Sequence, residues 1–227
     1  MAPVSTTCSF PPRSAYDETV QVKIGPDPGA KVFTIPKGIL IFYSGYFEGA
    51  LRHSSPFTEA RDGVFWLPDT DVDTWERFMV FLYRGEVDED GANPLKVLCR
   101  LWVLADRREV PLLMNKCIDN IRKEVTAVWC SPAEVLPYVY ANTAPGSALR
   151  RFVLLLSARA GQFAKVSPLH PSIAGYFDEE SRRDLLQLIW EFDDERVWRE
   201  SDVYDLDPCP EYHSHGPGEE DKCGMED

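Results

Sequence analysis

The first regular pattern along the chain is a strict alternation of apolar and polar residues over 19–24. Such alternation places every second side chain on the same face and is typical of a half-buried strand. Residues 25–29, with two glycines and two prolines, favour a turn, and 31–35 follow as the return strand. A third strand is predicted over 64–67, before a proline. The sequence therefore predicts a small three-stranded sheet.

Three amphipathic helices are predicted after the third strand. Asp71 or Asp73 can cap the first, whose apolar residues recur three and four apart and stop before Gly85. The second begins at 93–94, where an asparagine cap precedes a proline, and Pro111 opens the third. The side chains that we expect to be buried are Trp75, Phe78, Leu82, Leu98, Leu101, Trp102 and Ile121.

Further helices are predicted over 131–192. Ser131 and Glu134 have the spacing of a capping box, and Pro137 predicts a kink or an early end of the helix that follows. Ser147 begins another helix, and a last one spans about 178–192. The residues expected on its inward face are Leu185, Leu188, Ile189 and Phe192. Sheet and helices together indicate an α+β protein.

Composition supports a folded chain. Of its 227 residues, 44% are hydrophobic, which is enough for a sizeable core. No apolar run approaches the ~20 residues of a membrane-spanning helix, and the start of the chain shows no secretory signal. We therefore expect an intracellular protein, in the nucleus, the cytoplasm or both, that does not bind a membrane. The proline-containing residues 1–16 are expected to be a flexible lead, and the six scattered cysteines to be thiols.

The formal net charge of −13 is concentrated at the C-terminus. Residues 193–227 hold 13 carboxylates and three basic side chains, which leaves 24 acidic and 21 basic residues in 1–192. The arginine pairs at 150–151 and 182–183 are expected on solvated helix faces. Since nucleic-acid affinity rests largely on clustered Lys and Arg, we expect no direct nucleic-acid binding. Residues 193–227 are interpreted as an acidic tail.

Four short strings resemble the BTB/POZ family, in the order that the family has them, over about 17–125. Residues 20–25 look like its opening strand, and 44–51 resemble the helix in which a serine precedes two aromatic residues. Residues 82–86 are similar to its leucine-tyrosine-threonine-glycine-glutamate turn, and 104–112 to the connection between the next two helices. The resemblance implies a BTB/POZ fold, in which helices cover a small three-stranded sheet.

The strings at 138–143 and 147–151 resemble the helical extension of short filamentous-fungal BTB proteins. Residues 131–192 are therefore expected to form a C-terminal helical extension. Many animal members carry a histidine just after the second strand, where this chain has Ile-Pro-Lys at 35–37, and an N-terminal extension that swaps between subunits. A swapped homodimer is therefore not implied, and a monomer or another self-association remains open.

The resemblance implies a protein–protein interaction module. BTB domains frequently act as adaptors that bring substrates to a cullin ubiquitin ligase, through a hydrophobic residue, any residue and a glutamate between the second helix and the third strand. Phe57, Thr58 and Glu59 occupy that place here. Phe57 would fill a pocket on the cullin and Glu59 would set the register.

The alternative is that Phe57 folds back onto Tyr46 or Phe47. The chain is then a BTB scaffold or a transcription-associated oligomerisation protein, which contacts another BTB protein or other proteins without a cullin. An enzyme is the rival class. Gly25 and Gly29 flank prolines instead of opening a helix, and neither a Gly-x-Ser-x-Gly nor a His-Glu-x-x-His motif occurs. We expect no catalytic residues.

The tail contains four potential metal ligands, Cys209, His213, His215 and Cys223. Two thiolates and two imidazoles are a complete tetrahedral set for zinc, and 216–218 can reverse the chain before Cys223. A similar Cys-x-x-x-His-x-His string recurs near the end of fungal BTB relatives. The sequence allows a structural zinc ion here and predicts no other cofactor. The alternative is a disordered acidic tail with incidental histidines, because few apolar residues are available to bury.

Overall fold

The computed structural model describes residues 10–51, 64–160, 171–191, 198–209 and 211–215. The chain forms two compact units. The first contains Met1–Glu89, Arg100–Met114 and Ser214–Asp227, and the second contains Asp90–Cys99 and Asn115–His213. The helices α5 (Pro94–Arg107) and α6 (Pro111–Val128) contribute residues to both units.

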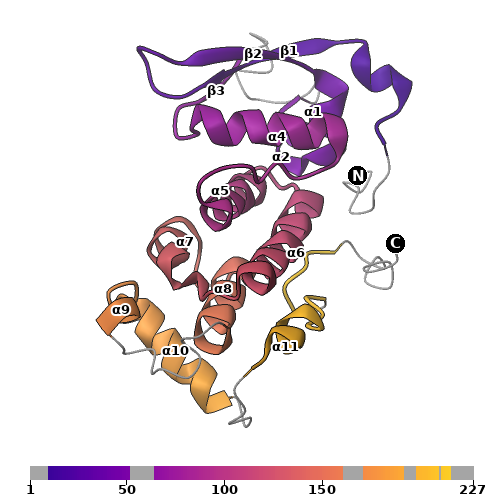
Figure 1. Ribbon diagram of the computed structural model, residues 1–227. Helices are drawn as coiled ribbons and strands as arrows, with labels where there is room; N and C mark the ends of the chain where they lie inside the picture. Colours follow the sequence, from indigo (N-terminus) through magenta and orange to yellow (C-terminus); the bar gives the residue numbers. More distant parts are fainter. Residues whose placement is uncertain (1–9, 52–63, 161–170, 192–197, 210, 216–227) are drawn as a thin grey trace. The chain divides into compact units, whose positions relative to one another are not determined.

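The first unit is built on a three-stranded sheet in the order β2-β1-β3 (Figure 1). The central strand β1 (Thr19–Ile24) pairs antiparallel with β2 (Lys31–Pro36) and parallel with β3 (Val64–Leu67). Every second residue of β1 is buried, as the alternation predicts. All three predicted strands are confirmed.

Three helices of the first unit accompany the sheet: α1 (Lys37–Tyr43), α2 (Gly45–Leu51) and α4 (Val72–Arg84). Phe47 of α2 contacts both Phe65 of β3 and Trp75 of α4, with ring centroids 5.7 and 6.4 Å apart. Asp71 caps α4, since its carboxylate accepts a hydrogen bond from the Thr74 backbone N–H at 2.9 Å. These aromatic contacts connect sheet and helices in one core.

The expectation of a loose lead through residue 16 is wrong for its last four residues. Arg13–Tyr16 form the 3-10 helix η1, and Ala15 is buried. A side chain at position 38 would clash with the Ala15 backbone, so Gly38 permits this close approach. The sequence pattern does not reveal a contact of this kind, because it joins two backbones and not two apolar side chains.

Short helices dominate the second unit. Besides its parts of α5 and α6, it contains η2 (Pro132–Val135), α7 (Leu136–Asn142), α8 (Ala148–Arg159), α9 (Pro171–Ala174), α10 (Glu179–Glu191) and α11 (Glu200–Tyr204). The predicted caps at Asn93 and Ser147 are confirmed, because their side-chain oxygens accept hydrogen bonds from the backbone N–H groups of Lys96 and Arg150.

The predicted capping box at Ser131 and Glu134 is wrong. The Ser131 hydroxyl donates to the Ser157 carbonyl at 3.3 Å, and Glu134 accepts a hydrogen bond from the Asn93 side chain at 2.8 Å. Tertiary partners thus take both side chains away from the local backbone. The early end predicted from Pro137 is confirmed, because η2 ends at Val135. Pro137 itself lies in the first turn of the next helix, α7, where its missing N–H is harmless.

Burial confirms the predicted core. All seven side chains predicted to be buried are at most 2% exposed. Cys99 and Cys117 are buried thiols, and desolvation raises the pKa of Cys99 to about 12. On α10, Leu185 is buried as expected but Ile189 is 47% exposed, so the predicted inward face is too wide. No helix within the described ranges combines the length and apolarity needed to cross a membrane.

Candidate functional site

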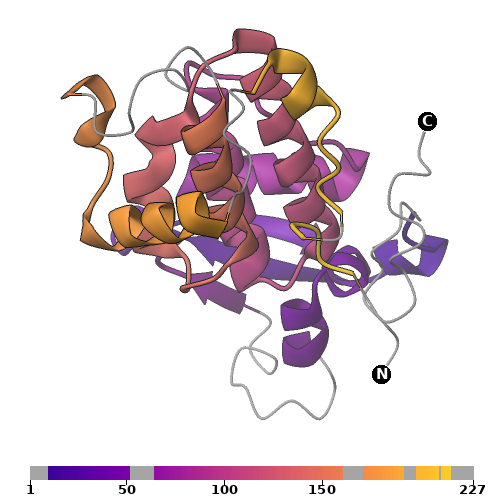
Figure 2. The same cartoon turned by 90° about the horizontal axis from the view of Figure 1, so that it is seen from below.

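The described part of the acidic tail is folded against the second unit. Val203 of α11 is fully buried, and Arg122 of α6 donates hydrogen bonds to the carbonyls of Tyr204 and Leu206 at 2.7 and 2.8 Å. Figures 1 and 2 both show the segment around α11 beside α6. The alternative of a disordered tail is therefore wrong for these residues.

Tyr212 anchors the segment that follows α11. Its side chain is 8% exposed, and its ring centroid lies 4.9 Å from that of Phe152 in α8. The Arg151 guanidinium lies 5.5 Å from the Tyr212 ring centroid. Desolvation and the neighbouring Glu211 carboxylate raise the pKa of Tyr212 to about 12. The phenol is therefore neutral near pH 7 and packs as an aromatic residue of the core.

The same turn brings three potential metal ligands together. The Tyr212 backbone N–H donates to the Pro208 carbonyl at 2.8 Å, which reverses the chain after Cys209. His213 and His215 follow this turn and are two positions apart. One ligand atom from each of Cys209, His213 and His215 lies within 4.8 Å of the other two.

This cluster is local to seven consecutive residues. The three ligands are Cys209, His213 and His215. Cys223, the fourth predicted ligand, lies outside the described residues. The structure thus brings together three of the four predicted ligands.

Asp119 of α6 adds a carboxylate that the sequence did not point to. Its Oδ1 lies 3.2 Å from Nε2 of His213, whose side chain is only 5% exposed. No sequence pattern links two residues this far apart in the chain. A carboxylate beside a histidine can fix the orientation of the imidazole ring.

The predicted cullin-contact residues Phe57, Thr58 and Glu59 lie outside the described residues. In the sequence they fall between the end of α2 at Leu51 and the start of β3 at Val64. The tripeptide therefore belongs to the segment that connects the second helix to the third strand.

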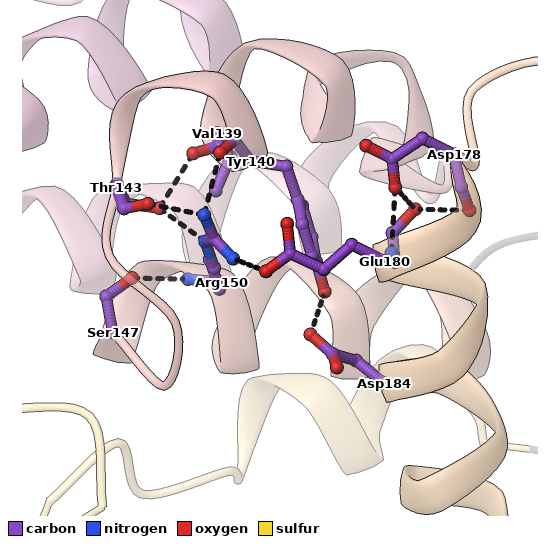
Figure 3. Close-up of polar contacts among 9 residues, drawn as sticks. Val139, Tyr140, Thr143, Ser147, Arg150, Asp178, Glu180 and Asp184 are labelled. Atoms are coloured by element: carbon purple, nitrogen blue, oxygen red, sulfur yellow. Dashed lines mark hydrogen bonds and ion pairs between the residues drawn. The ribbon is translucent and has the colours of Figure 1, made fainter.

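Arg150 is a buried polar centre that the sequence analysis placed wrongly on a solvated face (Figure 3). Its residue is 4% exposed, and its guanidinium donates to the Thr143 hydroxyl at 2.9 Å, the Tyr140 carbonyl at 2.7 Å and the Glu180 carboxylate at 2.6 Å. It also donates to the Thr143 carbonyl. Because these partners come from α7, α10 and the turn before α8, Arg150 joins the helices of the second unit.

Tyr140 completes this polar centre. Its ring lies 4.5 Å from the Arg150 guanidinium, and its hydroxyl donates to Asp184 at 2.9 Å. Desolvation and the Asp184 carboxylate raise the pKa of Tyr140, so the phenol keeps its proton. The arrangement holds charges in fixed pairs and has the features of a structural network.

A small mixed sheet packed against helices, and the helices that follow it, define an α+β domain. Residues 13–124 match the model of the BTB/POZ domain family, and the match begins at η1, four residues before the predicted boundary. These residues form a BTB/POZ domain, and the chain is a BTB/POZ domain protein. Such domains are in general protein–protein interaction modules and not enzymes. No curated protein matches the chain.

Proposed function

We propose that this BTB/POZ protein is a substrate adaptor for a cullin-type ubiquitin ligase. The observation that carries the proposal is a BTB/POZ domain over 13–124 with Phe57, Thr58 and Glu59 between α2 and β3. The domain would bind the cullin, and the second unit would be free to bind the substrate. This role belongs to the nucleus, the cytoplasm or both.

The fold fixes both ends of the segment that contains this tripeptide. Leu51 at the end of α2 and Phe65 in β3 are both buried in the first unit. Ser44 holds the start of α2, because its hydroxyl accepts a hydrogen bond from the Phe47 backbone N–H and donates to the Arg108 carbonyl. The described residues on either side of the segment are therefore part of the folded first unit.

The aromatic residues that Phe57 could fold onto already have other partners. Phe47 contacts Phe65 and Trp75, and the Arg108 guanidinium lies 4.7 Å from the Tyr46 ring centroid. This supports a role for Phe57 as an anchor on a partner. A buried aromatic residue beside a charged one is a common pairing in interaction hot spots, where the aromatic supplies most of the affinity.

Affinity purification of the full chain, followed by mass spectrometry, tests the adaptor role. We expect the wild-type protein to recover a cullin together with other proteins, and the Phe57→Ala variant to recover those other proteins without the cullin. If the wild type and Phe57→Ala both recover only scaffold or chromatin proteins, the result would contradict the proposal and favour a BTB scaffold. Circular dichroism of both variants controls for unfolding.

A further inference from the structure

We propose that Cys209, His213 and His215 bind a zinc ion that stabilises the segment around Tyr212. This site is independent of the adaptor function. Tetrahedral zinc with bonds of about 2.0–2.3 Å to nitrogen and sulfur separates its ligand atoms by about 3.3–3.6 Å. The three ligand atoms already lie within 4.8 Å of one another. Small side-chain rotations are therefore enough to close the site.

The donor types select the metal. A thiolate and two imidazoles suit zinc, whereas calcium and magnesium require oxygen ligands. Although the tail carries many carboxylates, the cluster itself contains none, so a hard cation would have no preferred donor there. Zinc is a non-redox ion of borderline-soft character, and it therefore matches one thiolate and two imidazoles.

The contact between His213 and Asp119 is a second and independent observation. A histidine that binds zinc commonly turns its other ring nitrogen towards a carboxylate, which fixes the ring and strengthens the metal bond. Here Nε2 of His213 lies 3.2 Å from Asp119 Oδ1, which assigns Nδ1 to the metal. The His213 side chain is 5% exposed, so it is largely shielded from water.

The position of Tyr212 indicates what metal binding would do to this segment. Tyr212 lies between Cys209 and His213 in the chain and packs on Phe152 of α8. A metal ion that joins these two ligands closes the loop around the Tyr212 anchor. Binding would therefore stabilise the docked segment, because a ligand that binds only the folded form shifts the equilibrium towards it.

The proposal concerns the three ligands in the described residues. Cys223, the fourth ligand that the sequence predicts, lies outside them.

Zinc content of the full chain, purified without a histidine tag, tests the site. We expect about one zinc per chain by elemental analysis, and less than about a tenth of that in Cys209→Ser. Cys130→Ser is the matched control, because Cys130 is an exposed cysteine outside the cluster, and it should retain the metal. Sub-stoichiometric zinc in the wild type, or unchanged zinc in Cys209→Ser, would overturn the proposal.

Two further variants keep the test decisive even if Cys209→Ser folds poorly. Asp119→Asn should keep the zinc but weaken its affinity about 10- to 100-fold in a chelator competition, and unchanged affinity would contradict the assigned role of Asp119. His215→Gln should weaken the zinc affinity by at least about tenfold in the same competition, since one of the three ligands is lost. Unchanged affinity would contradict ligation by His215.

Discussion

Arg150 connects several elements of the second unit through hydrogen bonds of its guanidinium. Its buried guanidinium donates to the carbonyls of Tyr140 and Thr143 in a buried and a partly buried hydrogen bond. Replacing it by Met would keep the apolar stem but leave these acceptors without their donors. Each such loss costs about 1–3 kcal/mol. We therefore expect Arg150→Met to lower the free energy of unfolding by about 2–4 kcal/mol in urea denaturation.

Arg183→Met is the control for this prediction. Its side chain is 72% exposed and pairs with Glu179, which is 94% exposed. Exposed pairs of this kind contribute at most about 1 kcal/mol and often nothing measurable. A loss in Arg183→Met as large as that in Arg150→Met would contradict the structural role of Arg150.

Hydrophobic periodicity predicted the burial of apolar residues correctly, but it could not predict the burial of polar ones. The stripe of α4 identifies Trp75 and Phe78 as core residues because spacing alone places them on one helix face. Arg150 has the same kind of position, but composition rules assign an arginine to the surface. Its burial depends on acceptors from α7 and α10, which only the tertiary structure brings together.

At the scale of elements, α4 holds the first unit together through its aromatic face. Phe78 is fully buried and its ring centroid lies 5.2 Å from that of Trp75. We expect Phe78→Ala to lower the free energy of unfolding by about 3–5 kcal/mol through lost burial and the cavity left behind. Tyr83→Ala on the same helix is the control, because Tyr83 is 47% exposed. A thermal melt of Phe78→Ala that matches the wild type would contradict the assigned core.

The start of α10 gives the second unit a pH dependence. Asp178 accepts hydrogen bonds from the Ser181 hydroxyl and backbone N–H at 2.7 and 2.8 Å, which lower the pKa of the Asp178 carboxyl below 3.8. Because the folded-state pKa is lowered, this stabilisation is present above pH 3.8 and is lost as the pH falls through the folded-state value.

Asp178→Asn separates the cap from its charge, since asparagine is an equally good cap that does not titrate. We expect the variant to match the wild type within about 0.5 kcal/mol at pH 7 and to lose less stability than the wild type between pH 5 and pH 2.5. Unfolding followed by circular dichroism across this range measures the difference. Parallel loss of stability in both proteins would contradict the charged cap.

Helix starts were predictable where the cap is local. Asn93 and Ser147 bind backbone N–H groups three residues on, and such caps can be read from neighbouring residues. Ser131 has the same local sequence but donates to Ser157 instead. The five-residue helix α11 was missed because it is too short for a periodic pattern and its last carbonyl, that of Tyr204, is bound by Arg122 of another helix.

For the whole molecule, the sequence predicted the BTB/POZ domain but did not predict that part of the tail is folded. The four family strings lie within the matched residues 13–124, so local motifs carried that part of the fold. The tail has an acidic composition, which is typical of disorder. Its few apolar residues, among them Val203 and Tyr212, nevertheless contribute to the core of the second unit.

Tyr212→Ala tests whether the tail is part of the second unit. We expect a loss of about 2 kcal/mol, less than for most core aromatics because a terminal segment can detach locally. Tyr204→Ala should change stability little, since Tyr204 is 68% exposed. Limited proteolysis should also cleave the Tyr212→Ala tail faster. Equal stability and equal cleavage in the two variants would contradict the docked segment.

The central claim, that the BTB/POZ domain binds a cullin, is tested most directly by isothermal titration calorimetry. The full chain is titrated with the N-terminal region of a BTB-binding cullin, and the titration is repeated with Phe57→Ala and Glu59→Lys. We expect the wild type to bind and both variants to bind at least about tenfold more weakly, as for a hot-spot residue worth more than 1.4 kcal/mol. No binding by the wild type, or equal affinity in all three proteins, would contradict the account.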